Sequence, residues 1–366
     1  MRPDSRSMLL NRERHLWKSN KMNNLTLAFL YNVRHKYPDP KDPGTIVDAD
    51  FDDPDTISWM LKHFKRCGYD VIPIEANEKA YFSLYENREK IDIAFNYAEG
   101  MYGNDREAQI PAMLEMLSIP YTGSSPLTRE NGHNKARMKD ILIANNVSTL
   151  PFQVFKTSKD KLDKGLFFPL IVKPVAQGSS AGITNSSVVA TEKELYKQVL
   201  FILDLFKQPA LVEPFLSGRE FSVPMIGNPP KLLPIIESKH DILPKKYLPL
   251  DSLEVKWIFE EESKGANFSC PAKISESLKK NIQEACFGAW QSIGYRDFCR
   301  IDLRCNGGED PYVLDINAPG LIPPEVSKTS YFPLSARVAG IEYDELLKMI
   351  IDEARKRYIN KVQIIQ

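Results

Sequence analysis

The feature that most constrains the fold is an alternation of short apolar runs with amphipathic segments in the first third of the chain. Residues 25–31 (LTLAFLY) and 91–96 (IDIAFN) have the length and composition of buried strands. Residues 56–66 and 107–117 place apolar side chains at helical spacing, and a short strand is expected at 71–73. Strands that alternate with helices are typical of layered α/β proteins, so we predict an α/β fold here.

The rest of the chain divides into two further units after a turn-rich stretch at 120–126 (PYTGSSP). The expected elements are strands at 170–173, 211–214, 220–226, 232–237, 298–304 and 312–316, and helices at 134–145, 192–206, 275–293 and 343–358. We therefore expect a flexible tail at 1–23, a domain at 24–126, a central subdomain at 127–213 and a C-terminal subdomain at 214–366. Met22, just before the first strand, is an alternative start to Met1.

The charge balance argues against a polyanionic partner. The 366 residues hold 48 Lys and Arg against 48 Asp and Glu, so the net charge is zero, whereas nucleic-acid and membrane-surface binders usually carry a basic excess. No apolar run approaches the about 18 residues of a spanning helix, and the polar start lacks a secretory signal. Five cysteines without a CxxC pair indicate reduced thiols. We expect a cytoplasmic protein with no nucleic-acid or membrane partner.

A predicted hairpin near the C-terminus carries a candidate metal site. Arg300 and Asp302 leave one face of a strand, Asp315 and Asn317 leave one face of the next, and residues 306–310 (NGGED) form a turn between them. If the turn centres between Gly308 and Glu309, Asp302 faces Asp315 and Arg300 faces Asn317. Opposed carboxylates repel unless a hard cation such as Mg²⁺ joins them. The alternative is an exposed face on which Arg300 pairs with the aspartates.

Two further segments carry candidate nucleotide-binding groups. A strand delivers Lys173 to a loop of small residues at 177–182 (QGSSAG), where backbone N–H groups can approach phosphate oxygens. No P-loop pattern is present, and an ordinary turn is the alternative. Glu213 ends one apolar strand and Glu220 begins the next, where a carboxylate could hold ribose hydroxyls; the alternative is that both are surface acids.

These pieces occur together with others in one order along the chain: AEGMYGNDREAQIPAMLEMLSIPYTGSS (98–125), NKARMK (134–139), PLIVKPVAQGSSAGI (169–183), LVEPFLSGREFSV (211–223), FSCPAKIS (268–275), RDFCRIDL (296–303), LDINAPG (314–320) and SYFP (330–333). In this order they resemble the ATP-grasp fold, and most closely the D-alanine–D-alanine ligase family. The resemblance covers roughly residues 90 to 350. It implies a three-domain ATP-grasp fold with a Rossmann-like, parallel-sheet N-terminal domain.

The resemblance also implies roles for individual residues. ATP would be bound by Lys135, Lys173, Gln177, Gly178, Ser179, Ser180, Glu213, Leu216 and Glu220. Two Mg²⁺ ions, replaceable by Mn²⁺, would be held by Asp302, Asp315 and Asn317. Catalytic roles fall to Arg300, Ser179, Lys246 and Tyr247, the last two on a loop that closes over the substrate. Substrate-binding roles fall to Glu99, Arg106, Gly320 and Ser330, and a homodimer is the family's usual assembly.

The departures from the family pattern concern the first substrate. The family follows its first strand with a Gly-rich turn and a glutamate that holds the ammonium of the first D-alanine, whereas residues 32–43 (NVRHKYPDPKDP) contain neither. The family's His-Gly is Glu99-Gly100 here, and its Glu-Asp-Gly is Asn104-Asp105-Arg106. A carboxylate at Glu99 and a cation at Arg106 imply a donor with a different charge placement. The alternative is neutral drift around an unchanged pocket.

The function that follows is ligation of small amino-acid substrates. We expect an ATP-dependent ligase that joins a carboxylate to an amine through an acyl phosphate and is not a standard D-alanine–D-alanine ligase. The alternatives are a genuine D-alanine–D-alanine ligase and a mycosporine ligase that adds serine or threonine. A protein that binds ATP without turnover is disfavoured, because Arg300, Asp302, Asp315 and Asn317 are all present. The sequence does not identify the base that deprotonates the amine.

Overall fold

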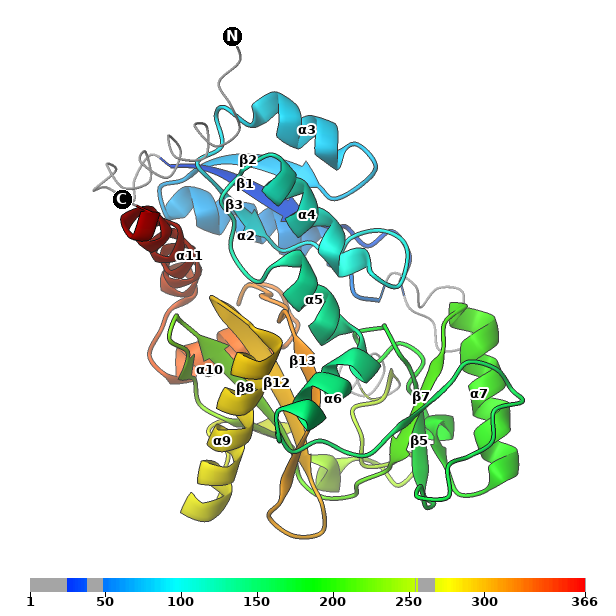
Figure 1. Cartoon of the computed structure of the whole chain (residues 1–366). Helices are drawn as coiled ribbons and strands as arrows, with labels where there is room; N and C mark the ends of the chain where they lie inside the picture. The colour runs from blue at the N-terminus through cyan, green and yellow to red at the C-terminus, as the bar shows by residue number, and fades with distance from the viewer. Residues whose placement is uncertain (1–24, 38–48, 254, 256–266, 366) are drawn as a thin grey trace.

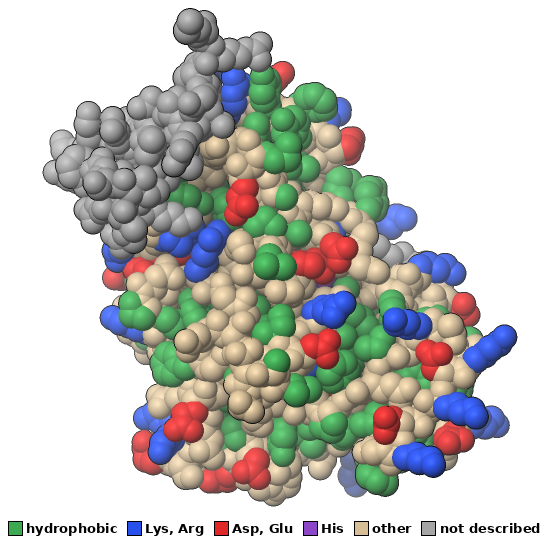
Figure 2. All heavy atoms as spheres, viewed as in Figure 1, with side chains coloured by type: hydrophobic (Ala, Val, Ile, Leu, Met, Phe, Trp, Pro, Cys, Tyr) green, Lys and Arg blue, Asp and Glu red, His purple; other side chains and the backbone are tan. Residues whose placement is uncertain are grey.

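The computed structural model describes residues 25–37, 49–253, 255 and 267–365 (Figure 1). The expected tail at 1–23, with Met22, lies outside these residues. In the described part of the chain no helix combines the length and apolarity needed to cross a membrane. Positive and negative side chains are interspersed over the face shown in Figure 2.

The first sheet is parallel, as the resemblance to the ATP-grasp fold implied. Its order is β2–β1–β3, and both pairs run in the same direction. The central four residues of β1 are all buried, as expected where helices cover both faces of a sheet. The strands are β1 (Thr26–Tyr31), β2 (Asp70–Glu75) and β3 (Ile93–Asn96), and the helices of this region are α2 (Pro54–Arg66), α3 (Ala80–Asn87) and α4 (Gln109–Met116). Helix α3 was not predicted.

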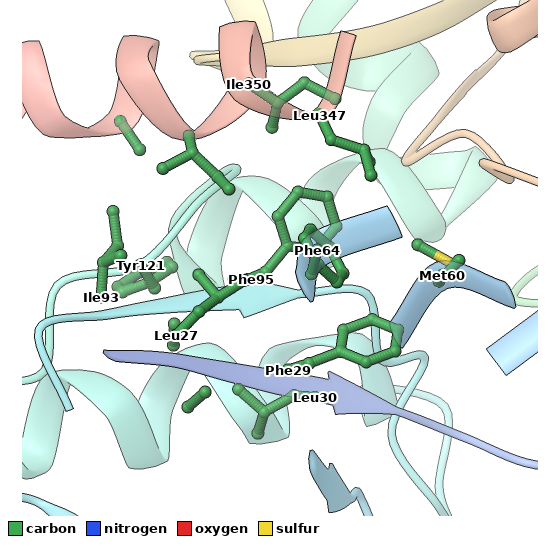
Figure 3. Packing of buried hydrophobic residues seen from close by; sticks show 14 of the residues in the cluster. Leu27, Phe29, Leu30, Met60, Phe64, Ile93, Phe95, Tyr121, Leu347 and Ile350 are labelled. Atoms are coloured by element: carbon green, nitrogen blue, oxygen red, sulfur yellow. The ribbon is translucent and has the colours of Figure 1, made fainter. Parts of the chain in front are cut away.

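The last helix of the chain packs on this first sheet. Leu347 and Ile350 of α11 (Tyr343–Ile365) belong to the same buried cluster as Phe64 and Phe95 (Figure 3). The apolar face of α11 was visible in the sequence, but its partner lies more than two hundred residues earlier. The division into domains at 24–126, 127–213 and 214–366 stays a prediction. Helix α11, at the end of the third predicted domain, packs on the sheet of the first.

The second sheet is antiparallel and has the order β4–β7–β5–β6. Helix α7 (Glu192–Phe206) covers it and begins with a capping box, in which Thr191 and Glu194 each bond the other's backbone N–H. This helix has the predicted bounds. The strands are β4 (Gln153–Phe155), β5 (Leu170–Pro174), β6 (Val188–Val189) and β7 (Ala210–Pro214), and helices α5 (Pro126–His133) and α6 (Lys135–Ala144) precede them. Helix α5 and strand β4 were not predicted.

The third sheet has the order β11–β10–β8–β12–β13, with β9 also paired to β8. The single strand predicted at 232–237 is wrong, because it is two strands separated around Pro234, a residue that has no N–H for a ladder. The strands are β8 (Glu220–Ile226), β9 (Lys231–Leu232), β10 (Ile236–Ser238), β11 (Phe268–Ser269), β12 (Phe298–Cys305) and β13 (Pro311–Asn317), with helices α9 (Glu276–Ile293) and α10 (Tyr331–Val338).

Candidate functional site

A cavity of about 920 Å³ is lined by residues from all three sheet regions. It gathers side chains that lie more than two hundred residues apart in the sequence. The predicted site residues that line it are Glu99, Lys135, Lys173, Gln177, Gly178, Ser179, Ser180, Glu220, Arg300, Asp302, Asp315, Asn317, Gly320 and Ser330. Five others, Arg106, Glu213, Leu216, Lys246 and Tyr247, are not part of the lining.

The hairpin brings the two aspartates into register. Asp302 pairs with Asp315, and Arg300 pairs with Asn317, as predicted. The expected turn centre was wrong, because Cys305 pairs with Pro311 and the turn therefore centres on Gly308. A β-bulge between Asp302 and Leu303 corrects the register by one residue. Without it, Asp315 would lie on the opposite face from Asp302, since side chains alternate along a strand.

Asp302 is surrounded by hydrogen-bond donors. Arg300 binds it with two parallel bonds, Nε to Oδ1 at 2.9 Å and Nη2 to Oδ2 at 2.8 Å. Ser222 Oγ donates to Oδ1 at 2.6 Å, and Asn317 Nδ2 donates to Oδ2 at 2.9 Å. Burial lowers the pKa of Arg300, but the adjacent Asp302 carboxylate outweighs it, so the net shift is upward. The guanidinium therefore stays charged.

The donor set on this face suits a hard cation. Two facing carboxylates and one side-chain amide supply oxygen ligands, and Mg²⁺ usually completes its octahedron with waters and substrate phosphates. The negative charge is balanced here by Arg300 on Asp302 and by Lys135, whose Nζ lies 3.1 Å from Asp315 Oδ2. Among the described residues no group of three His, Cys, Asp or Glu side chains forms a closed metal cage. The residues fit an ion that shares its ligands with a bound nucleotide.

Two lysines extend the positive charge along the cavity. Lys135, at the start of α6, also donates to the carbonyl of Gln177 at 2.8 Å. Lys173 lies on β5 and forms an ion pair with Glu213. Lys135 is thus held by a carboxylate and a backbone carbonyl, and Lys173 by a carboxylate. Their binding to phosphate oxygens stays a prediction.

Glu213 lies inside the protein and not on the cavity wall. Its carboxylate pairs with Lys173 and, at 2.7 Å, with Lys139 Nζ, and the Glu213 and Lys139 side chains are both almost completely buried. Burial raises the pKa of Glu213, but the two lysines outweigh it and bring it to about 2. Sequence reasoning missed Lys139, although it lies one helical turn after Lys135. The side chain of Glu213 therefore orders two lysines and does not face the cavity.

The small-residue loop after β5 is held by two distant segments. Ser179 and Ser180 have positive φ values of 46° and 59°. Ser180 Oγ donates to the carbonyl of Asp251 at 2.6 Å, and Gly178 N donates to Asp50 Oδ2 at 3.3 Å. A Cβ on Gly178 would lie 2.6 Å from Asp50 Oδ1. The loop is thus tethered to two distant segments, and its phosphate-binding role stays a prediction.

The expected closing loop contributes different residues from those predicted. Lys246 and Tyr247 do not reach the cavity; the Lys246 ammonium lies 4.8 Å from the centre of the Tyr247 ring. Leu250 and Asp251, a few residues later, line the cavity instead. A loop without regular periodicity gives no local signal for which of its side chains points inward.

Glu220 begins β8 and lines the cavity, as expected. Its carboxylate lies 3.0 Å from Arg304 Nη1 and 3.9 Å from His240 Nε2. Burial and the charge of Asp251 raise the pKa of Glu220 above its usual range, although Arg304 and His240 oppose the shift. Arg304 and His240 were not predicted, because their partners are distant in sequence. Arg304 does share the strand face of Asp302, a period-two signal that could have found it.

The comparisons with known proteins agree with this geometry. The family model for the D-alanine–D-alanine ligase C-terminus matches residues 141–352. The chain belongs to the D-alanine–D-alanine ligase family. An uncharacterized protein of Sinorhizobium fredii, y4sG, is 31% identical over 333 residues, covering 88% of this chain and 92% of that protein. D-alanine–D-alanine ligase A of Bacillus cereus is 29% identical over 81% of this chain and 91% of its own.

Solved structures support the same fold. The crystal structure of the D-alanine–D-alanine ligase from Bacillus anthracis complexed with ATP has a TM-score of 0.69 at 23% identity, over 92% of this chain and 99% of that one. The ligase from Coxiella burnetii gives 0.67 at 18% identity, over 94% of this chain and 97% of that one. This D-alanine–D-alanine ligase family member therefore has the ATP-grasp fold and is an ATP-dependent carbon–nitrogen ligase.

Arg106 does not have the substrate-facing position that the sequence predicted. Its side chain is buried and forms an ion pair with Asp50, so it is not available to a substrate in this structure. Glu99 does line the cavity, and its backbone N–H is fixed by Asn32 Oδ1 at 2.9 Å. Burial and the charge of Glu107 raise the pKa of Glu99 well above its usual range.

Gly320 and Ser330 meet at the same end of the cavity. Ser330 Oγ donates to the Gly320 carbonyl at 2.5 Å, and the next amide, Leu321 N, donates to Tyr97 Oη at 3.0 Å. Two cations that were not predicted, Arg34 and Lys328, also line the cavity, and they bind opposite oxygens of Asp53 at 2.9 and 2.8 Å. These contacts join segments from the N-terminal and C-terminal parts of this family member.

Proposed function

We propose that this protein joins an amino acid, through its carboxylate, to the amino group of a second amino acid while ATP is converted to ADP and phosphate. The observation that carries the proposal is the alignment of Asp302 opposite Asp315, with Arg300 and Lys135 bonded to them in one cavity. Lys173 lines the same cavity. An array of paired cations and carboxylates suits phosphoryl transfer, which depends on positioning and charge neutralisation.

The reaction has two steps. A carboxylate oxygen of the first substrate attacks the γ-phosphorus of ATP, the bond to the bridging oxygen breaks, and ADP leaves. The amine nitrogen of the second substrate then attacks the acyl carbon, the C–O bond to phosphate breaks, and the amine loses a proton. Removing one electrostatic contact to such developing charge typically costs about 10²-fold in rate.

Asp302, Asp315 and Asn317 would hold two Mg²⁺ ions, or Mn²⁺ in their place, and the ions supply neutralisation of phosphate charge when bound. Lys135 and Lys173 bind phosphate oxygens in exchange for their carboxylate partners. Arg300 is oriented by its two bonds to Asp302, and its remaining donors stabilise the oxygens of the acyl phosphate and the tetrahedral intermediate.

Water must be kept from the acyl phosphate, which it would hydrolyse. The loop at 177–182 is supported from both sides, through Gly178 to Asp50 and through Ser180 to Asp251. Both acceptors belong to cavity-lining segments outside the loop. We assign the loop the role of covering the γ-phosphate, with the segment around Leu250 and Asp251 as its partner in closure.

The substrate pair is proposed to differ from two D-alanines. The support is the altered first-substrate region, with Glu99 on the cavity wall and Arg106 turned away to Asp50. The second candidate is D-alanine–D-alanine ligation itself, which is favoured by the similarity to D-alanine–D-alanine ligase A of Bacillus cereus. A dimer is the assembly that the family suggests.

The deciding experiment is phosphate release from Mg·ATP by the purified full chain, with D-alanine alone and with single and paired amino acids. Release with another pair but not with D-alanine supports the first candidate and names its substrates. Release with D-alanine alone, with D-alanyl-D-alanine as product, establishes the second. No release with any amino acid overturns both.

A further inference from the structure

Residues 246–253, which we call the lid segment, pack against the chain that follows β5. Leu248 N donates to Asn185 Oδ1 at 2.9 Å, a few residues beyond the small-residue loop. Within that loop, Ser180 Oγ donates to the Asp251 carbonyl at 2.6 Å. The lid segment is therefore joined directly to the loop that we expect to cover the γ-phosphate.

The lid segment is joined to the third sheet through the side chain of Asp251. His240 Nε2 lies 2.9 Å from Asp251 Oδ1, and Ser238 Oγ donates to Asp251 Oδ2 at 3.2 Å. Ser238 ends β10, and His240 begins the short 3-10 helix that follows. Asp251 thus binds the sheet region with its carboxylate and the small-residue loop with its carbonyl.

His240 faces a second carboxylate on the cavity wall. Glu220 Oε2 lies 3.9 Å from His240 Nε2 and 3.0 Å from Arg304 Nη1. Arg304 also donates to the carbonyl of Pro249 in the lid segment. The side chains of His240, Asp251, Glu220 and Arg304 are each at most 15% exposed, so solvent screens their charges little. Two cations therefore hold the lid segment beside the carboxylate that we expect to bind ribose.

This arrangement favours the charged form of His240. Burial lowers the pKa of His240, but the bond to Asp251 and the charge of Glu220 outweigh it. Arg304 opposes the shift, and the net direction is upward from 6.5. The charged groups next to His240 in the sequence have other surroundings: Lys239, which pairs with Glu237, and Asp241, which is exposed. The imidazolium therefore has Asp251 as its nearest charged partner.

We propose that protonated His240 is a positioning residue that holds the lid segment closed over the bound nucleotide. The ion pair fixes Asp251, and Asp251 in turn holds the small-residue loop. Loss of the proton leaves a neutral hydrogen bond, which is weaker than a charge-assisted one, so the lid segment opens more readily as the pH rises. This inference rests on the proposed function, since it assigns a pH-dependent control to closure of the same cavity.

The test measures how fast tritiated adenosine 5′-(β,γ-imido)triphosphate, bound with Mg²⁺, leaves the full chain during a chase with unlabelled ATP. His240→Gln keeps a donor towards Asp251 and removes the charge. At about pH 6, we expect dissociation from His240→Gln to be about tenfold faster than from wild type. Because His240 loses its charge as the pH rises through its pKa, the two rates should converge by about pH 9.

Two further variants make the comparison specific. Asp251→Asn removes the opposite charge and should reproduce the fast rate, and the double variant should be no faster than either single one. If His240→Gln does not fold, Asp251→Asn decides by the same comparison. His35→Gln changes a histidine that is 73% exposed and outside the cavity lining, and its rate should match wild type at every pH.

Two results overturn the proposal. One is a folded His240→Gln protein whose dissociation rate at about pH 6 is within about twofold of wild type. The other is a faster rate whose ratio to wild type stays constant across the pH range, because a merely structural role of the side chain does not depend on its charge.

The same measurement separates this inference from the proposed function. If the expected ratio is found but no amino acid gives phosphate release from ATP, the ligase proposal fails and the role of His240 stands. If the wild type is an active ligase and its nucleotide dissociation does not depend on His240, the role of His240 fails and the ligase proposal stands. If the wild type binds no nucleotide, both are overturned.

Discussion

Replacement of Glu213 by glutamine should destabilise the protein by about 3 kcal/mol at neutral pH. The pKa of this buried carboxylate falls from 4.5 to about 2 in the folded state. Since a tenfold change in an equilibrium is worth about 1.4 kcal/mol, the shift corresponds to about 3 kcal/mol of stability. Removal of one partner of a buried ion pair typically lowers the free energy of unfolding by a similar amount. Here Lys139 and Lys173 would remain without their carboxylate.

The assay is urea denaturation of wild type and Glu213→Gln as a function of pH. The folded-state pKa is lower than the unfolded one, so the contribution is fully present above about pH 4.5 and is lost as the pH falls towards 2. The difference between the two proteins should therefore shrink over that window. Glu276→Gln, at a side chain that is 89% exposed, is the control and should stay within about 0.5 kcal/mol of wild type.

A double variant tests the cause. Lys139→Met removes the other fully buried partner, so the pair Glu213→Gln and Lys139→Met should cost less than the sum of the two single changes. A loss below about 1 kcal/mol for Glu213→Gln at pH 7 would refute the reasoning. So would a loss of 3 kcal/mol that stays constant down to the lowest pH at which both proteins fold.

Three further predictions concern activity. Asp315→Ala should lower phosphate release by about 10²-fold or more, because it removes one of the two facing carboxylates; turnover within tenfold of wild type would contradict the metal assignment. Arg300→Lys keeps the charge but loses the two-bond fork to Asp302, and kcat should fall about 10- to 100-fold while the melting temperature changes little. Lys246→Ala should leave kcat/KM within about twofold, since its side chain lies outside the cavity lining; a tenfold loss would restore the role expected from the sequence.

Features that depend on the spacing of residues within one element could be predicted from the sequence. The alternation along residues 25–117 indicated an α/β layer, and the period of two along 298–317 placed Arg300 with Asp302 and Asp315 with Asn317 on shared faces. Even here the prediction was incomplete, because no local pattern in the sequence indicates the bulge after Asp302. The predicted pairing of Asp302 with Asp315 is correct, although the predicted turn centre lies half a residue from the observed one.

What sequence reasoning by itself determined was the set of local elements and, through ordered motifs, the nucleotide chemistry of the family. The tertiary structure decided which charges meet: Glu213 with Lys139, Arg106 with Asp50, and His240 with Asp251. It also decided that α11 covers the first sheet. Periodicity is a property of neighbouring residues, so a sequence displays it directly. The partner of a buried charge or apolar face is chosen by packing between distant segments, where leaving either group unpaired is costly.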